Sequence, residues 1–113
     1  MGQLHYNAQT FAFEDRTLLH LQLVIGLKLR RREPFFLAWR ADTSAGSGRH
    51  ALWIDNGIPI HAEFVGGRAA SINRDWVEQL ITSANTGPGL NLADEHNHEP
   101  APVESSRQDR ATR

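Results

Sequence analysis

Cysteine is absent from this sequence of 113 residues. Its absence excludes disulfide bridges, thiolate metal sites and thiol nucleophiles, and it is typical of proteins that work in a reducing compartment. Lysine is nearly absent too, because Lys28 is the only lysine among 12 basic residues. We therefore expect a cytoplasmic protein whose positive charge is carried by arginine.

Two further absences limit the partners that we expect. No apolar run approaches the roughly 20 residues needed to cross a bilayer, and the opening residues MGQLHYN lack the apolar segment of a secretory signal. The formal net charge is only −1, so the molecule as a whole generates no basic field that would attract nucleic acid. We expect no membrane partner, and contact with nucleic acid would require a local cluster of basic residues.

The residues that are present suffice for one small folded domain. Hydrophobic residues make up 40% of the chain, and they include three Trp and five Phe. Residues 94–113 contain one large aliphatic residue, Val103, and no aromatic residue, so they cannot repay the entropy of ordering. We predict a single α+β domain over 1–93 and a disordered tail over 94–113. His96 and His98 lie in that tail without a scaffold, so we expect no metal site.

The stretch LHLQLVIGLKLRRRE at residues 19–33 fits both a strand and a helix. Every odd position from Leu19 to Leu29 is aliphatic, which is the period of a strand. A strand of this length would be unusual, however, and leucine favours helices over strands. Asp15 is suited to cap the start of a helix, and Pro34 would end it. We therefore predict a helix over residues 16–32.

As a helix, this stretch carries two apolar stripes. The first stripe consists of Leu18, Leu21, Ile25 and Leu29, and the second consists of Leu19, Leu23 and Leu27. Between the stripes, on the solvent side of the helix, we expect His20, Lys28 and Arg31. A helix with two apolar stripes needs two partners. One is the sheet, and the other is either the second helix or another subunit. The second stripe is therefore a candidate surface for self-association or for binding another protein.

The remaining segments predict a mainly antiparallel sheet and a second helix. Strands are predicted over 3–6, 10–14, 35–40, 49–54, 58–65 and 90–92. A second helix is predicted over 74–85, with Asn73 as its N-cap. The first two strands form a hairpin, and the strands between 35 and 65 form a three-stranded meander because Asn56-Gly57 is a strong hairpin turn. The predicted order is β-β-α-β-β-β-α-β, an α+β fold with both helices packed on the sheet.

The end of the first predicted helix is a candidate for binding phosphates. It carries Lys28, Arg30, Arg31 and Arg32 within five positions. Such a run can contact the phosphates of DNA. The alternative is a solvated helix end whose positive charge complements the helix dipole.

A glycine-rich segment offers a second candidate for binding an anion. In the predicted loop over 42–48 and its continuation, Gly46, Gly48 and Arg49 could surround an anion with backbone N–H groups and a guanidinium. The alternative is a mobile hairpin loop. Further arginines would extend a basic patch only if the fold brings them together, namely Arg40, Arg68 and Arg74.

Aromatic side chains are numerous enough to stack on nucleic-acid bases. The candidates are Phe35, Phe36, Trp39, Trp53 and Phe64. In a chain of this size most aromatic residues belong to the core. We predict that Trp53 is the most exposed of them.

The order and spacing of several short segments match those of a known family. The segments are MGxLxY at 1–6, DRTLLHLQLVIGLKLRR at 15–31, FFLAW at 35–39, GSGR at 46–49, LW at 52–53, IP at 58–59, INRDWVEQLITSAN at 72–85 and GL at 89–90. On these segments the chain, over about residues 1–92, resembles a family of small actinobacterial proteins that are often labelled automatically as ATP-dependent DNA ligases. The resemblance supports the helical interpretation of 16–32 and implies a connection with DNA, and with ATP if the label describes an activity.

The residues argue against ligase activity itself. ATP-dependent ligases attach AMP to the lysine of a K-x-D-G motif, whereas Lys28 is followed by Leu-Arg-Arg. A complete ligase is also more than twice as long as this chain. We therefore predict no catalytic residues and no cofactor. The expected function is a non-catalytic binding module with DNA as its partner, and the alternatives are a protein-binding or self-associating module and a small ligase-like enzyme.

Overall fold

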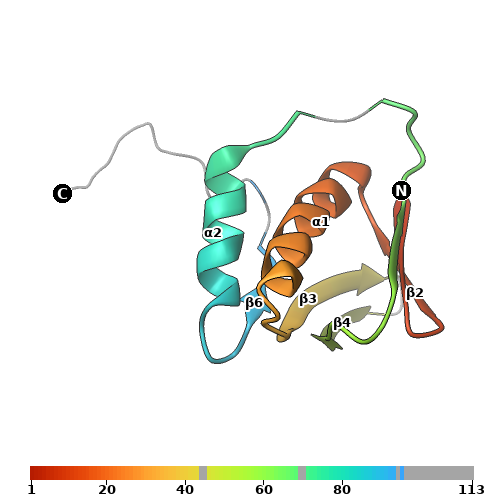
Figure 1. The fold of residues 1–113 in the computed structure, drawn as a ribbon. Coiled ribbons are helices and arrows are strands. Elements are labelled where there is room, and N and C mark those ends of the chain that lie inside the picture. The colour runs from red at the N-terminus through yellow and green to blue at the C-terminus, as the bar shows by residue number, and fades with distance from the viewer. Residues whose placement is uncertain (44–45, 69–70, 94, 96–113) are drawn as a thin grey trace.

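The computed structural model describes residues 1–43, 46–68, 71–93 and 95, and the side chains of 41–47 are not described. The elements are β1 (Gly2–Tyr6), β2 (Gln9–Phe13), α1 (Asp15–Arg30), β3 (Phe35–Thr43), β4 (Gly46–Ile54), β5 (Ile60–Glu63), α2 (Arg74–Ala84) and β6 (Leu90–Asn91) (Figure 1). This order confirms the predicted α+β fold. Among the described residues no helix is long and apolar enough to cross a membrane.

The strands form two sheets, so the predicted meander is wrong. β5 does not pair with β4; it pairs with β1 and completes the sheet β2-β1-β5, while β4, β3 and β6 form the second sheet. The turn after β4 is hydrogen-bonded to β1 and α1. The backbone N–H of Asp55 donates to the Tyr6 hydroxyl at 2.8 Å, and the Asn56 amide donates to the carbonyl of Leu29 at 2.7 Å. Pro59 has no N–H for a ladder beside β4. The chain therefore crosses to the other sheet, where β5 pairs with β1. In the second sheet β3 and β6 run parallel.

The helical interpretation of the leucine-rich stretch is confirmed by α1, but its predicted cap is not. Glu14 occupies the N-cap position. The Asp15 carboxylate instead accepts hydrogen bonds from the backbone N–H of Gly66 at 2.8 Å and of Val65 at 3.1 Å. These two bonds lower the pKa of Asp15. Asp15 therefore anchors the segment that follows β5 and does not cap the helix.

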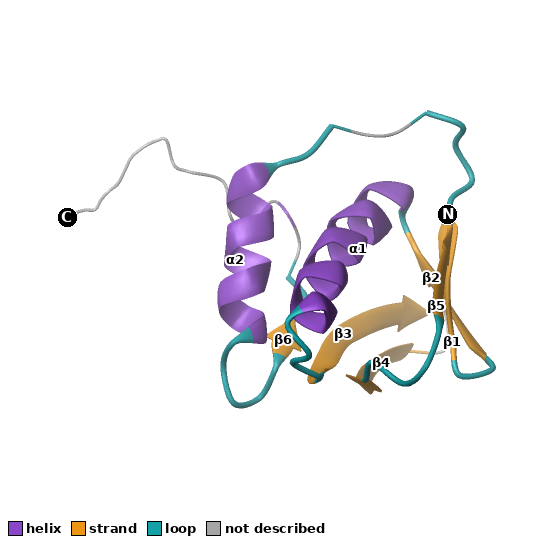
Figure 2. Cartoon of the chain, viewed as in Figure 1, coloured by secondary structure: helices purple, strands orange, loops and turns teal. Residues whose placement is uncertain are grey.

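The two helices pack against each other, and α1 also contacts β1 while α2 contacts β3 and β6 (Figure 2). α1 buries Leu18, Leu21 and Ile25 of its first stripe, while Leu29 is half-buried. α2 covers the side of α1 that carries His20 and Lys28. Both residues were predicted outside but are buried. The Nε2 atom of His20 accepts from the backbone N–H of Asn73 at 2.9 Å, and its Nδ1 lies 2.7 Å from the carbonyl oxygen of Arg16. Since a carbonyl can only accept, Nδ1 carries the proton and the ring bridges the two helices.

α2 begins as predicted. The Asn73 side chain caps it by accepting from the backbone N–H of Trp76 at 3.2 Å. Trp76, Leu80 and Ala84 are buried against the rest of the core. The indole N–H of Trp76 donates to the carbonyl of Ala93 at 3.1 Å, which fixes the chain just after β6.

β3 alternates between a buried and an exposed face. Phe35, Leu37 and Trp39 point into the core. Phe36 is 43% exposed, and Trp53 on β4, which was predicted to be the most exposed of the aromatic candidates, is 46% exposed. Because the helices cover only one face of the sheet β4-β3-β6, the other face remains accessible.

Candidate nucleic-acid interface

The accessible face of the sheet β4-β3-β6 gathers side chains from three strands. We define this open face by Phe36, Ala38 and Arg40 of β3, Arg49, Ala51 and Trp53 of β4, and Asn91 of β6. Residues directly opposite each other in a ladder share one face of the sheet. The register pairs Phe36 with Trp53, Ala38 with Ala51, and Arg40 with Arg49, and it places Asn91 beside Ala38. All seven are exposed except Ala38, which is half-buried.

The middle of the open face is hollowed. A shallow cavity of about 570 Å³ is lined by Ala38, Arg40, Arg49, Ala51 and Asn91, with Trp39, His50 and Leu92 completing its wall. The small alanine side chains form its floor. The two guanidinium groups and the Asn91 amide supply hydrogen-bond donors at its rim.

Arg40 and Arg49 form a pair of like charges at one end of the open face. Like charges directly opposite each other in a sheet destabilise it. An anion held between them would offset that repulsion, and guanidinium groups bind phosphate oxygens through paired hydrogen bonds. A phosphate group therefore has the charge and the hydrogen-bond acceptors that suit these two side chains.

Phe36 and Trp53 form the other end of the open face. Their ring centroids lie 5.0 Å apart, and the planes meet at 67°. An edge-to-face pair leaves part of each ring accessible to a third aromatic group. This end of the open face therefore offers aromatic surface to a flat ring system such as that of a base.

The basic run after α1 is only partly available for phosphates. Arg30 ends α1, Arg31 and Arg32 lie in the turn that leads towards β3, and all three are exposed. Lys28 is buried, where its Nζ donates to the Asn85 side chain at 2.7 Å and forms an ion pair with Glu33 at 3.1 Å. Lys28 therefore connects the ends of the two helices and is not positioned to contact a phosphate.

The two arginine groups lie at different ends of β3. Arg30, Arg31 and Arg32 precede the strand, whereas Arg40 follows its first residue by five positions, or roughly 17 Å along an extended chain. Arg68 lies before α2 and Arg74 begins α2. Neither of them lines the hollow of the open face. Of the arginines named from the sequence, the fold thus places Arg40 and Arg49 opposite each other.

The glycine-rich segment is not the predicted loop. Gly46 and Gly48 belong to β4, where they pair with Thr43 and Ala41 of β3. Their backbone groups therefore belong to an extended ladder, which lacks the concave shape of an anion-binding loop. The segment was predicted as a loop because its residues are small and polar, but pairing with a long β3 keeps it extended.

The second leucine stripe remains partly accessible on α1. Leu23 is 42% exposed, and Leu19 and Leu27 are half-buried. The rest of the domain thus covers this stripe only in part. Self-association through Leu19, Leu23 and Leu27 stays a prediction.

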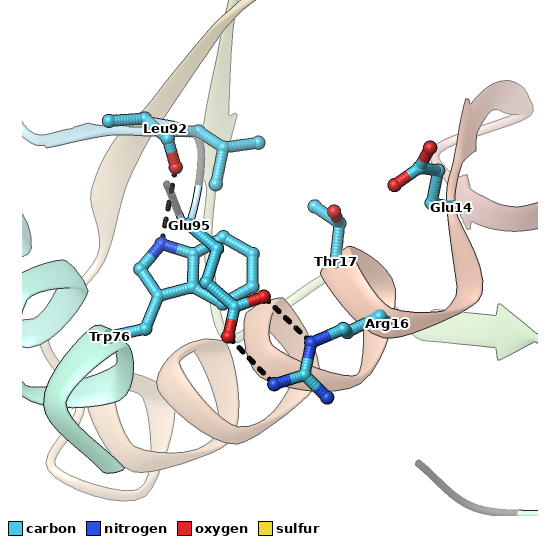
Figure 3. A pocket seen from close by; sticks show the side chains of 7 residues that line it. Glu14, Arg16, Thr17, Trp76, Leu92 and Glu95 are labelled. Carbon is cyan, nitrogen blue, oxygen red and sulfur yellow. Dashed lines mark hydrogen bonds and ion pairs between the residues drawn. The ribbon is translucent and has the colours of Figure 1, made fainter. Parts of the chain in front are cut away.

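A second cavity lies between the start of α1 and the chain after β6 (Figure 3). It measures about 300 Å³ and is lined by Glu14, Arg16, Thr17, Trp76, Leu92, Ala93 and Glu95. The Glu95 carboxylate accepts two hydrogen bonds of 2.7 Å from the Arg16 guanidinium. It also accepts one of 2.7 Å from the Asn73 amide. We call this group of three residues the Arg16–Glu95 clasp.

The clasp serves structure more than binding. The hydrogen bonds from Arg16 and Asn73 lower the pKa of Glu95 to about 2. The remaining Arg16 nitrogen donates to the carbonyl of Ser71 at 2.7 Å. Because the Arg16 and Glu95 side chains already bind each other, a ligand in the cavity would have to compete for them. Glu95 itself belongs to the predicted tail, of which it is the one described residue.

The structure supplies no evidence for a metal centre in the described part of the chain, where no three His, Asp or Glu side chains form a suitable group. His96 and His98 lie outside the described residues. His5, His50 and His61 are on strands, and the His5 and His61 rings stack with centroids 5.0 Å apart.

Comparison with known proteins identifies one family. The sequence pattern of a family described as "Domain of unknown function (DUF7882)" matches residues 1–95. No curated protein and no solved structure matches the chain significantly. The match covers every described element and ends at Glu95, the last residue of the clasp. The actinobacterial source and the ligase label that the resemblance implied stay predictions.

Proposed function

The chain belongs to the DUF7882 family, and because that family's description names no activity, we propose its function from the open face. The domain is a non-catalytic module that binds nucleic acid, with DNA as the partner. The observation that carries this proposal is the exposed Arg40–Arg49 pair, set opposite each other across β3 and β4.

Charge and surroundings both support this proposal. The net charge is −1, so the attraction of phosphates depends on where the arginines lie and not on the net charge of the molecule. Arg40 and Arg49 line the same hollow, and the exposed turn with Arg30, Arg31 and Arg32 lies before the other end of β3. A polyanion that runs along β3 would meet positive charge at both ends. A role beside DNA ligation or repair, which the family resemblance implies, is part of this proposal.

Fluorescence anisotropy with labelled DNA tests the proposal. The wild type should bind, and affinity should fall steeply as salt rises because bound phosphates release counterions. Arg40→Ala/Arg49→Ala should weaken binding and reduce the salt slope by about 0.7 for each lost single-strand phosphate contact. Comparison of nicked with intact duplex tests the connection with ligation.

The control is Arg68→Ala/Arg74→Ala, which removes the same charge from exposed positions away from the open face. Equal losses in both double variants would mean that only net charge matters. No salt-sensitive binding by the wild type would refute the proposal. Arg30→Ala/Arg31→Ala/Arg32→Ala then measures how much the turn after α1 adds.

A second candidate function is self-association or protein binding through α1. The 42% exposure of Leu23 favours it, since a large apolar side chain on a helix often marks a contact surface. Sedimentation of the wild type over a range of concentrations tests this candidate. A concentration-dependent mass that Leu23→Asp abolishes would support it.

A further inference from the structure

The two ends of the open face differ in chemistry, and this difference identifies the form of nucleic acid that fits. We propose that the open face binds an unpaired, single-stranded segment, with a base stacked on Trp53 beside Phe36 and backbone phosphates held by Arg40 and Arg49. This inference rests on the proposed function and deepens it, because it names the ligand of the same face.

The accessible aromatic rings favour an unpaired base. In a duplex each base is stacked between its neighbours and presents only an edge, so its flat face cannot reach a side chain. Single strands expose those flat faces, and proteins that bind them combine aromatic platforms with a basic path for the backbone. Phe36 and Trp53 supply such a platform on the same face as the arginine pair.

The spacing along β3 suits a short stretch of strand. Arg40 lies four residues beyond Phe36, or about 13 Å along an extended chain. Between them Ala38 and Ala51 leave the hollow of about 570 Å³. Their small side chains allow a sugar–phosphate backbone to pass from the aromatic end to the arginine end.

The aromatic end is also held in place by the fold. A Cβ on Gly89 would lie 2.5 Å from the Phe36 carbonyl oxygen, which shows how closely the loop before β6 packs on Phe36. Phe36 is therefore fixed on both sides, by β4 and by this loop. A rigid platform loses little conformational freedom on binding, which favours affinity.

Charge complementarity favours nucleic acid over a second copy of the chain. A second copy packed face to face would bring its own Arg40 and Arg49 onto an interface that already carries two guanidinium groups. Removing such charges from water without an anionic partner is costly. A phosphate backbone supplies that anionic partner.

Three labelled probes of equal length test the inference on the intact chain. They are an oligothymidylate, an abasic strand with the same number of phosphates, and a fully paired duplex. Anisotropy should show the tightest binding for oligothymidylate. The abasic strand should bind about tenfold to a hundredfold more weakly, which is the range for losing a base–aromatic stack.

Intrinsic fluorescence supplies a second readout. Trp53 is 46% exposed, whereas Trp39 and Trp76 are 8% and 2% exposed, so quenching by a bound base reports mainly on Trp53. Oligothymidylate should quench the emission, and the abasic strand should not. Trp53→Leu should remove both the quenching and the preference for bases, while Trp53→Phe retains the preference because it keeps an aromatic ring.

Val65→Ala is the matched control, since it shortens an exposed apolar side chain in the segment after β5, outside the open face. Thermal melts establish that each variant is folded. The comparison of the abasic strand with oligothymidylate needs only the wild type, so it holds even if a variant fails to fold.

Each remaining outcome refutes a defined part of the inference or of the proposed function. Equal binding of the abasic strand and oligothymidylate, still lost in Arg40→Ala/Arg49→Ala, refutes base stacking but leaves the proposed function. Tighter binding of the duplex refutes the single-strand preference in the same way. No binding of any probe refutes both. A concentration-dependent mass that Trp53→Leu abolishes makes the open face a contact between copies and also refutes the inference.

Discussion

At the scale of single residues, Gly89 shows how one small side chain supports the open face. Its φ is +93°, in the left-handed region, and a Cβ would lie 2.5 Å from the Phe36 carbonyl oxygen and 2.9 Å from the Phe36 Cβ. Both the backbone conformation and the close approach require glycine. Phe36 thus keeps its place partly because residue 89 lacks a side chain.

Gly89→Ala should therefore destabilise the domain by about 1–3 kcal/mol, the cost of a strained backbone conformation. The matched control is Gly87→Ala, because a Cβ at Gly87 would meet nothing within 4 Å. Urea denaturation measures the free energy of unfolding of both variants. Equal stability of the two would contradict the close packing of this loop on Phe36. If the inference above holds, Gly89→Ala also weakens the preference for bases.

At the scale of elements, α1 shows that periodicity finds a helix but not all of its partners. The odd-numbered aliphatic residues read as a strand, and only the length of the stretch and its leucine content favoured a helix. That prediction is confirmed. The position of Lys28 was mistaken, because a sequence does not show that α2 covers the polar side between the two stripes.

Lys28→Met tests the assignment of Lys28 to the connection between the helices. The variant loses the hydrogen bond to Asn85 and the ion pair with Glu33, so we expect destabilisation of about 1 kcal/mol. Its affinity for DNA should equal that of the wild type, unlike that of Arg40→Ala/Arg49→Ala. Thermal melts and anisotropy measure the two effects. A large loss of affinity without a loss of stability would restore Lys28 to the phosphate contacts.

β4 shows a similar limit at the same scale. Small polar residues predicted a loop over 42–48, yet the ladder continues through Gly46 and Gly48. Arg40 and Arg49 both lie within the predicted strands, but the register that sets them opposite each other was not predicted.

At the scale of the whole molecule, the Arg16–Glu95 clasp joins three distant parts of the chain. Arg16 lies at the start of α1, Asn73 caps α2, and Glu95 follows β6. The clasp holds the last described residue against the beginning of the domain. The family match likewise extends to residue 95, two residues beyond the boundary at 93 that composition suggested.

Glu95→Gln should lower the free energy of unfolding by about 1–2 kcal/mol at neutral pH, because it weakens charge-assisted hydrogen bonds. The folded state lowers the pKa of Glu95 from 4.5 to about 2. Its stabilisation is therefore fully present above pH 4.5 and is lost as pH falls towards 2. The difference between wild type and variant should vanish over this range.

Denaturation at a series of pH values measures this difference, with Glu78→Gln on the exposed surface of α2 as the control. Glu78→Gln should leave stability nearly unchanged at every pH. A Glu95→Gln effect that persists at the acid end would show that the clasp stabilises through packing and not through the charge of Glu95.

Local sequence patterns sufficed to predict the kinds and order of the elements, the cap of α2 by Asn73 and the exposure of Trp53. These features depend on period, capping chemistry and local composition, which act over a few residues. The folded structure was needed to show that β5 pairs with β1, that His20 and Lys28 are buried, and that Arg40 faces Arg49 beside an aromatic pair. These depend on contacts between segments far apart in the chain, which leave no local pattern.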